Sequence, residues 1–137
     1  MPASADGREA GLGVAVAAES LYLANLLVLP GLAFVALVLL WRRQRAGAPL
    51  ARAHLAQTMS ASLWAGVLLV VANALIVLLG GYDGPATWVI VITYFTVCHS
   101  ALVVFGAYGL AKAMAGQCWR FPLVGRALPA NCPGERA

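Results

Sequence analysis

The chain has 137 residues, of which 62% are apolar and 10% are charged, and its formal net charge is +4. An ordinary soluble domain has about 45–50% apolar and 25% charged residues, so this composition excludes a soluble fold. The basic excess indicates membrane topology and contact with anionic headgroups, because no basic motif interleaved with aromatic residues points to nucleic-acid binding.

Three runs lack Asp, Glu, Lys and Arg, and they hold 22, 30 and 28 residues: 20–41, 53–82 and 84–111. A helix needs about 20 mostly apolar residues to cross a bilayer, so each run suffices for one crossing and is too short for two with a turn. The sequence therefore predicts an all-α integral membrane protein with three transmembrane helices in one domain, residues 19–116.

The segment 1–18 is expected to be a mobile outer segment. It does not fit a cleaved signal peptide, because Asp6 and Glu9 accompany Arg8 in its first part. The first transmembrane helix is expected over about 19–41. Pro30 and Gly31 interrupt its centre and predict a kink, which serves either packing or a functional opening.

The second helix is expected over about 50–80 and the third over about 85–115, joined by a turn rich in glycine. The remaining residues, 117–137, form a predicted cytoplasmic tail that is ordered as far as Leu128. No internal repeat or second domain is evident.

Basic residues decide the predicted orientation, because cytoplasmic loops retain Lys and Arg. The loop after the first run and the tail together hold eight of them: Arg42, Arg43, Arg45, Arg52, Lys112, Arg120, Arg126 and Arg136. The other side offers only Arg8. We therefore expect the N-terminus outside and the C-terminus in the cytoplasm.

Polar side chains inside the bilayer are the candidate functional residues. At about 1.5 Å of rise per residue, Asn25, Asn73 and Thr93 all fall in the outer half of the membrane. Interhelical hydrogen bonds of this kind contribute about 0.6 kcal/mol on average, so a cluster of the three is expected to help the helices pack.

His99 lies near the predicted midplane, where an ionisable group tends to mark function. Thr96 and Ser100 flank its side of the helix. Its ring is expected to hydrogen-bond Ser62 or a backbone carbonyl of the second helix. The alternatives are a proton relay, or ligation of haem or a metal ion with a partner subunit.

Catalytic and resident metal sites are not predicted. No membrane segment carries a central Asp or Glu, and no Gly-x-Ser nucleophile turn occurs. Cys98, Cys118 and Cys132 lack the short spacing of zinc or redox motifs, and the cytoplasmic side is reducing, so three free thiols and no cofactor are expected.

Two segments at the predicted inner surface resemble a family of small bacterial membrane proteins. They are His54-Leu55-Ala56-Gln57, which opens the second helix, and the segment 116–126, which contains Arg120, Phe121 and Pro122. That uncharacterised family is distantly similar to the twenty-kilodalton component of the chloroplast inner-envelope import machinery. The resemblance covers about residues 20–128 and implies a fold of three or four helices.

Read physically, His54 and Gln57 are placed to hydrogen-bond the segment 120–122 and hold the tail against the helix ends. The leading hypothesis is a non-enzymatic protein of the bacterial inner membrane, an accessory or assembly subunit that packs against other integral subunits or itself. One alternative is an oligomeric translocation or transport component, and a second is a redox assembly that uses His99.

Overall fold

The computed structural model describes residues 5–134, and every regular element in this range is a helix. The helices are α1 (Ala5–Leu27), α2 (Leu32–Arg43), α3 (Pro49–Leu78), α4 (Ala86–Thr93), the π-helical turn η1 (Tyr94–His99) and α5 (Ser100–Met114). Three helical stretches are long and apolar enough to cross a membrane: Ala5–Leu27, Pro49–Leu78 and Ala86–Met114. The predicted all-α fold with three such helices is confirmed, but the first of them has different bounds.

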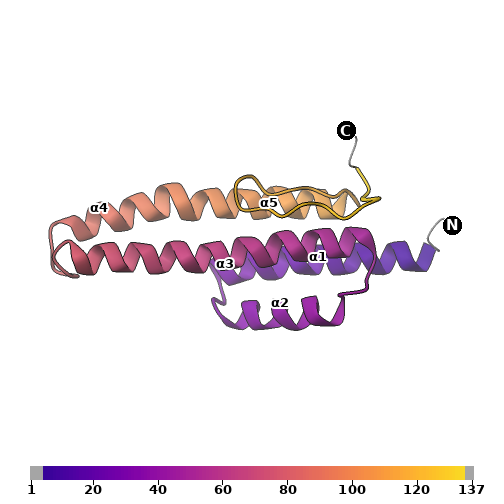
Figure 1. Ribbon diagram of the computed structural model, residues 1–137, viewed down its shortest axis with the longest axis horizontal. Helices are drawn as coiled ribbons and strands as arrows, with labels where there is room; N and C mark the ends of the chain where they lie inside the picture. Colours follow the sequence, from indigo (N-terminus) through magenta and orange to yellow (C-terminus); the bar gives the residue numbers. More distant parts are fainter. Residues whose placement is uncertain (1–4, 135–137) are drawn as a thin grey trace.

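The predicted first helix over 19–41 is wrong, because the chain reverses direction within it. Residues 28–31 form a turn in which Gly31 has a φ of 85°, a value that side-chain-bearing residues rarely adopt. Asn25 stabilises the turn by accepting a hydrogen bond from the Gly31 backbone N–H at 2.9 Å. The predicted kink at Pro30 and Gly31 is therefore a hairpin turn, and α2 runs back alongside α1 (Figure 1).

Residues 5–18 belong to α1, so the expected mobile segment 1–18 is helical wherever the structure describes it. Gly11, Ala15 and Ala18 are buried in α1 at spacings of four and three, which places them on one helix face. These small side chains allow close approach: a Cβ added at Gly11 would lie 2.9 Å from the Cβ of Ala48. This face of α1 is buried because its small side chains let neighbouring segments pack closely against the helix.

The hydrophobic core is concentrated at one end of the bundle. Ala18 of α1, Leu37 of α2 and Leu55 of α3 form one buried cluster, so all three helices meet there. The second half of α3 and the helix α4 contribute few buried residues, and their large apolar side chains are exposed, as Val70 at 69% and Trp88 at 72% illustrate. Apolar surface of this extent needs lipid or another protein to cover it.

The start of α1, the loop between α2 and α3 and the tail all lie at this same end, while the turn between α3 and α4 lies at the other (Figure 1). A cavity lined by Arg8, Ala48, Gly116 and Pro133 places the start of α1, the loop between α2 and α3, the end of α5 and the tail together. We expected the two ends of the chain on opposite sides of the membrane. In this fold the reversal at Gly31 adds the helix α2, so both described ends lie at the same end of the bundle. The tail is also ordered beyond Leu128, as far as the described Gly134.

Candidate functional site

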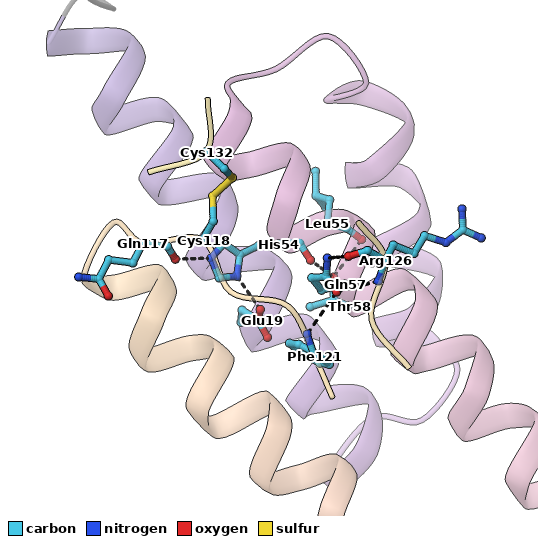
Figure 2. A network of polar contacts seen from close by, with 10 residues as sticks. All are labelled: Glu19, His54, Leu55, Gln57, Thr58, Gln117, Cys118, Phe121, Arg126 and Cys132. Atoms are coloured by element: carbon cyan, nitrogen blue, oxygen red, sulfur yellow. Dashed lines mark hydrogen bonds and ion pairs between the residues drawn. A yellow bond between two sulfur atoms is a disulfide. The ribbon is translucent and has the colours of Figure 1, made fainter. Parts of the chain in front are cut away.

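Glu19 of α1 and His54 of α3 form a fully buried polar pair. The His54 Nδ1 lies 2.6 Å from the Glu19 Oε1, and both side chains are 0% exposed. Figure 2 shows the pair enclosed between the helices and the returning tail. We call the pair, Gln57, Ser60 and their contacts with residues 117–126 the clasp.

The hydrogen bond made by the second ring nitrogen of His54, Nε2, determines how the pair is protonated. The His54 Nε2–H donates to the Gln117 carbonyl oxygen at 2.9 Å, because a carbonyl only accepts. Nδ1 and the Glu19 carboxyl group then share one proton. The pair is neutral overall whether that proton sits on nitrogen or on oxygen, which lowers the cost of burying it.

The second carboxyl oxygen of Glu19 has no hydrogen-bond partner in the described structure. It lies against Gly109 of α5, where an added Cβ would come within 2.6 Å of it. Only glycine leaves room for the carboxyl group at this position. Tyr22, one turn further along α1, ties the same two helices by donating its hydroxyl to the Leu102 carbonyl oxygen at 3.0 Å.

Gln57 holds the tail against α3 with both atoms of its amide. Its Oε1 accepts from the backbone N–H groups of Phe121 at 3.3 Å and Arg126 at 3.0 Å. Its Nε2 donates to the Arg126 carbonyl oxygen at 2.7 Å (Figure 2). Ser60, one turn further along, donates to the Val124 carbonyl oxygen at 2.6 Å. Side chains of α3 thus provide hydrogen-bond partners for backbone groups of the tail at Phe121, Val124 and Arg126.

A disulfide joins Cys118 and Cys132 within the tail. The predicted free thiols at these two positions are therefore wrong, and Cys98 alone of the three is free. Their separation of 14 residues gives no motif, but the tail folds back on itself, and the Cys118 N–H donates to the Pro133 carbonyl oxygen at 2.7 Å. This return brings the two sulfur atoms together.

The residues predicted at the inner surface divide into two groups. His54, Gln57 and Phe121 are buried in the clasp, and the expected contact between Gln57 and the tail is present. The side chains of Arg120 and Pro122 are exposed. The prediction missed Glu19, although a lone carboxylate in an apolar helix is a recognised sign that a buried partner exists.

The predicted polar cluster of Asn25, Asn73 and Thr93 does not form. Asn25 accepts from Gly31, whereas Asn73 donates to the Leu69 carbonyl oxygen at 2.8 Å and accepts from the Tyr82 hydroxyl at 2.8 Å. Each asparagine thus has its partner in its own or an adjacent segment.

His99 closes the π-helical turn η1 and lines a cavity of about 430 Å³ together with Ser62, Asn25 and the turn at Gly31. Its ring packs against Phe95, with centroids 5.2 Å apart. The expected bond between His99 and Ser62 is absent from the described structure, and the buried Ser62 hydroxyl has no partner.

The polar neighbours of His99 face outwards. Ser100 is exposed and donates to the Phe95 carbonyl oxygen at 2.8 Å, and Thr96 is exposed as well. Among residues 5–134, no three His, Cys, Asp or Glu side chains are grouped so that they could hold a metal ion.

The family model for magnetosome magnetite crystal formation proteins matches residues 13–128 of this chain. The chain belongs to this family. The matched range contains every residue of the clasp from Glu19 to Arg126, while Cys132 lies outside it. Comparison with curated proteins and with solved structures gave no match. The match identifies a magnetosome membrane family and gives no support to the expected likeness to the chloroplast import component.

Proposed function

We propose that this member of the magnetosome magnetite crystal formation family is a non-enzymatic accessory or assembly subunit. In this proposal it packs against other integral subunits, or further copies of itself, in the bacterial inner membrane. One observation carries the proposal: the chain closes its own core at the clasp end and leaves the rest of α3, α4 and η1 with little intramolecular burial. A protein with a packed core at one end and long exposed apolar faces elsewhere is suited to bind other membrane helices through those faces.

The exposed polar groups on one face support protein contact over lipid contact alone. Thr96 and Ser100 lie four residues apart and are exposed, and no partner for the Thr96 hydroxyl occurs among the described residues. Small and hydroxyl-bearing side chains at this spacing favour close packing of membrane helices. We therefore assign the face of η1 and α5 that carries Thr96 and Ser100 to the partner.

Copurification tests the proposal. The full-length tagged protein, extracted from its native membranes in a mild detergent, is expected to elute with at least one other integral protein or as a homo-oligomer. Elution as a lone monomer would contradict it.

A deletion tests the link to crystal formation. Cells that lack the protein are expected to form magnetite crystals of altered size or number by electron microscopy. Unchanged crystals would show that the protein is not needed for crystal formation.

For the orientation, we propose that both described ends of the chain face the cytoplasm. The turn at 79–85 holds no Lys or Arg. All eight Lys and Arg residues of the described range lie at the end that carries the clasp: Arg8, Arg42, Arg43, Arg45, Arg52, Lys112, Arg120 and Arg126. Such a bias marks the cytoplasmic side. In a cysteine-free background, a cysteine at Asp83 is expected to react with an impermeant maleimide in spheroplasts, and a cysteine at Asp6 is not. The reverse pattern would overturn the orientation.

The cavity beside His99 favours a second candidate, a redox assembly in which His99 carries a proton or ligates a cofactor shared with a partner. The Ser62 hydroxyl, which has no hydrogen-bond partner among the described residues, lines this cavity together with His99. Replacement H99L is expected to abolish cofactor absorbance in the purified assembly while leaving its composition intact. Unchanged spectra would indicate that His99 has a packing role.

The alternative of an oligomeric translocation or transport component stays a prediction. It is tested by measuring flux through proteoliposomes that contain the protein.

A further inference from the structure

A further cavity opens at the clasp end, and neither Glu19 nor His54 lines it. It has a volume of about 530 Å³ and lies between the end of α2, the first turns of α3 and tail residues 127–129. This volume falls in the usual range for small-molecule sites, about 300–1,000 Å³. Trp41 lines it, and tryptophan is enriched where a membrane meets water.

Two guanidinium groups dominate the charge of this cavity. Arg45 and Arg52 both line it, and Asp and Glu are absent from its described lining. Neither arginine has a carboxylate within ion-pair distance in the described structure. The Arg45 guanidinium lies over the Trp41 ring, 4.6 Å from its centroid, which keeps the group beside the cavity.

The neighbouring surface of α2 is apolar and exposed. Leu39 is 50% exposed and Val35 is 56% exposed, one and two turns before the basic end of the helix. Arg42 and Arg43 are exposed at that end and add to the positive potential. A ligand that suits both surfaces has an anionic head at the two arginines and hydrocarbon chains along α2.

We propose that this cavity binds the phosphate of an anionic phospholipid headgroup between Arg45 and Arg52. The guanidinium fork matches phosphate oxygens bidentately, and basic pockets beside membrane helices recognise such headgroups. The acyl chains would lie along Val35 and Leu39, which selects a lipid over free phosphate. This site requires no partner subunit, so its test is independent of the assembly role.

Binding is measured by native mass spectrometry of the full-length protein titrated with phosphatidylglycerol or phosphatidylcholine. The wild type is expected to prefer phosphatidylglycerol, and R45Q/R52Q to lose about 30-fold in affinity for it, which corresponds to about 2 kcal/mol. The control K112Q/R120Q removes the same charge from the same end of the protein and is expected to keep the preference. Since Arg45 and Arg52 are exposed, the helical circular dichroism of R45Q/R52Q should match the wild type.

Three results would overturn the proposal: no preference for phosphatidylglycerol in the wild type, an equal loss in both double variants, or competition by inorganic phosphate at equal concentration. The last would identify free phosphate as the ligand. If R45Q/R52Q does not fold, the single variants R45Q and R52Q carry the comparison, each with an expected loss of about fivefold. Retention of full affinity in both single variants would also refute the site.

Discussion

Replacing His54 is the sharpest test of the clasp. In H54L the side-chain volume is nearly kept, but the Glu19 Oε1 loses the imidazole that lies 2.6 Å away, and the Oε2 has no partner to begin with. Breaking a fully buried pair by removing one member costs about 3–5 kcal/mol. The lost bond to the Gln117 carbonyl oxygen adds about 1 kcal/mol.

The magnitude is to be read from reversible unfolding in mixed detergent micelles, followed by helical circular dichroism. E19L is expected to lose less than H54L, about 1–3 kcal/mol, because a neutral imidazole tolerates a missing partner better than a carboxylate does. The double variant E19L/H54L buries neither group, so it should be more stable than H54L alone.

This double-mutant cycle separates the pair from simple loss of packing. If the two single losses add in E19L/H54L to within about 0.5 kcal/mol, Glu19 and His54 are not coupled. Such additivity, or a loss in H54L no larger than that of an ordinary surface substitution, would refute the reasoning about the shared proton.

Three further predictions concern the contacts around the pair. G109A is expected to destabilise the protein by about 1–3 kcal/mol in the same unfolding assay, because its Cβ would lie 2.6 Å from the Glu19 carboxyl group. The control G66A meets nothing within 4 Å and should be neutral or stabilising; equal losses in both would contradict the account. Q57A is expected to release the tail, giving faster hydrogen exchange at residues 121–126, and unchanged exchange would show that the tail is held elsewhere. C132S should lower stability by about 3 kcal/mol in oxidising buffer, as expected for a 14-residue loop, and by nothing in dithiothreitol; a loss in both buffers would indicate a packing role instead.

The general architecture was predictable because it depends on composition. Charge-free runs of sufficient length require membrane helices, and the second and third predicted helices agree with α3 and with α4 to α5 within a few residues. The contact between Gln57 and the tail was also predictable, since both segments were expected at the same membrane surface.

The reversal at Gly31 was not predictable from the same signals. A proline followed by glycine within an apolar run fits a kinked helix and a hairpin turn equally well. The choice depends on tertiary contacts, such as Leu37 packing against Ala18 and Leu55. A hydropathy profile does not register these contacts, because residues 28–31 of the turn are themselves apolar or glycine.

The error at Glu19 follows from that one misplaced turn, whereas the error at the disulfide follows from the return of the tail. With a helix from 19 to 41, Glu19 stands at the outer surface, far from His54. Once α1 begins at Ala5, the same residue is a buried position within α1 and contacts His54 of α3. Cys118 and Cys132 meet only because the tail returns along this end of the bundle, and local spacing does not encode that return.

The charge distribution and the disulfide point to different compartments. The orientation proposed from Lys and Arg has the clasp end in the cytoplasm, whereas disulfides persist on the oxidising side of a membrane. Charge bias acts during insertion, so the proposed orientation rests on it. In this orientation the Cys118–Cys132 disulfide faces a reducing compartment, and the hydrogen bonds from Gln57 and Ser60 hold the tail in place independently of it.

Site-specific crosslinking in native membranes tests the central claim, that the exposed face of η1 and α5 packs against another subunit. A photo-crosslinking residue at Thr96 is expected to yield a discrete adduct larger than the 14.3 kDa chain. The same residue at Val35, exposed on α2 where the acyl chains of a lipid are proposed to lie, is expected to yield little. No adduct at Thr96, together with elution of the protein as a monomer, would contradict the account.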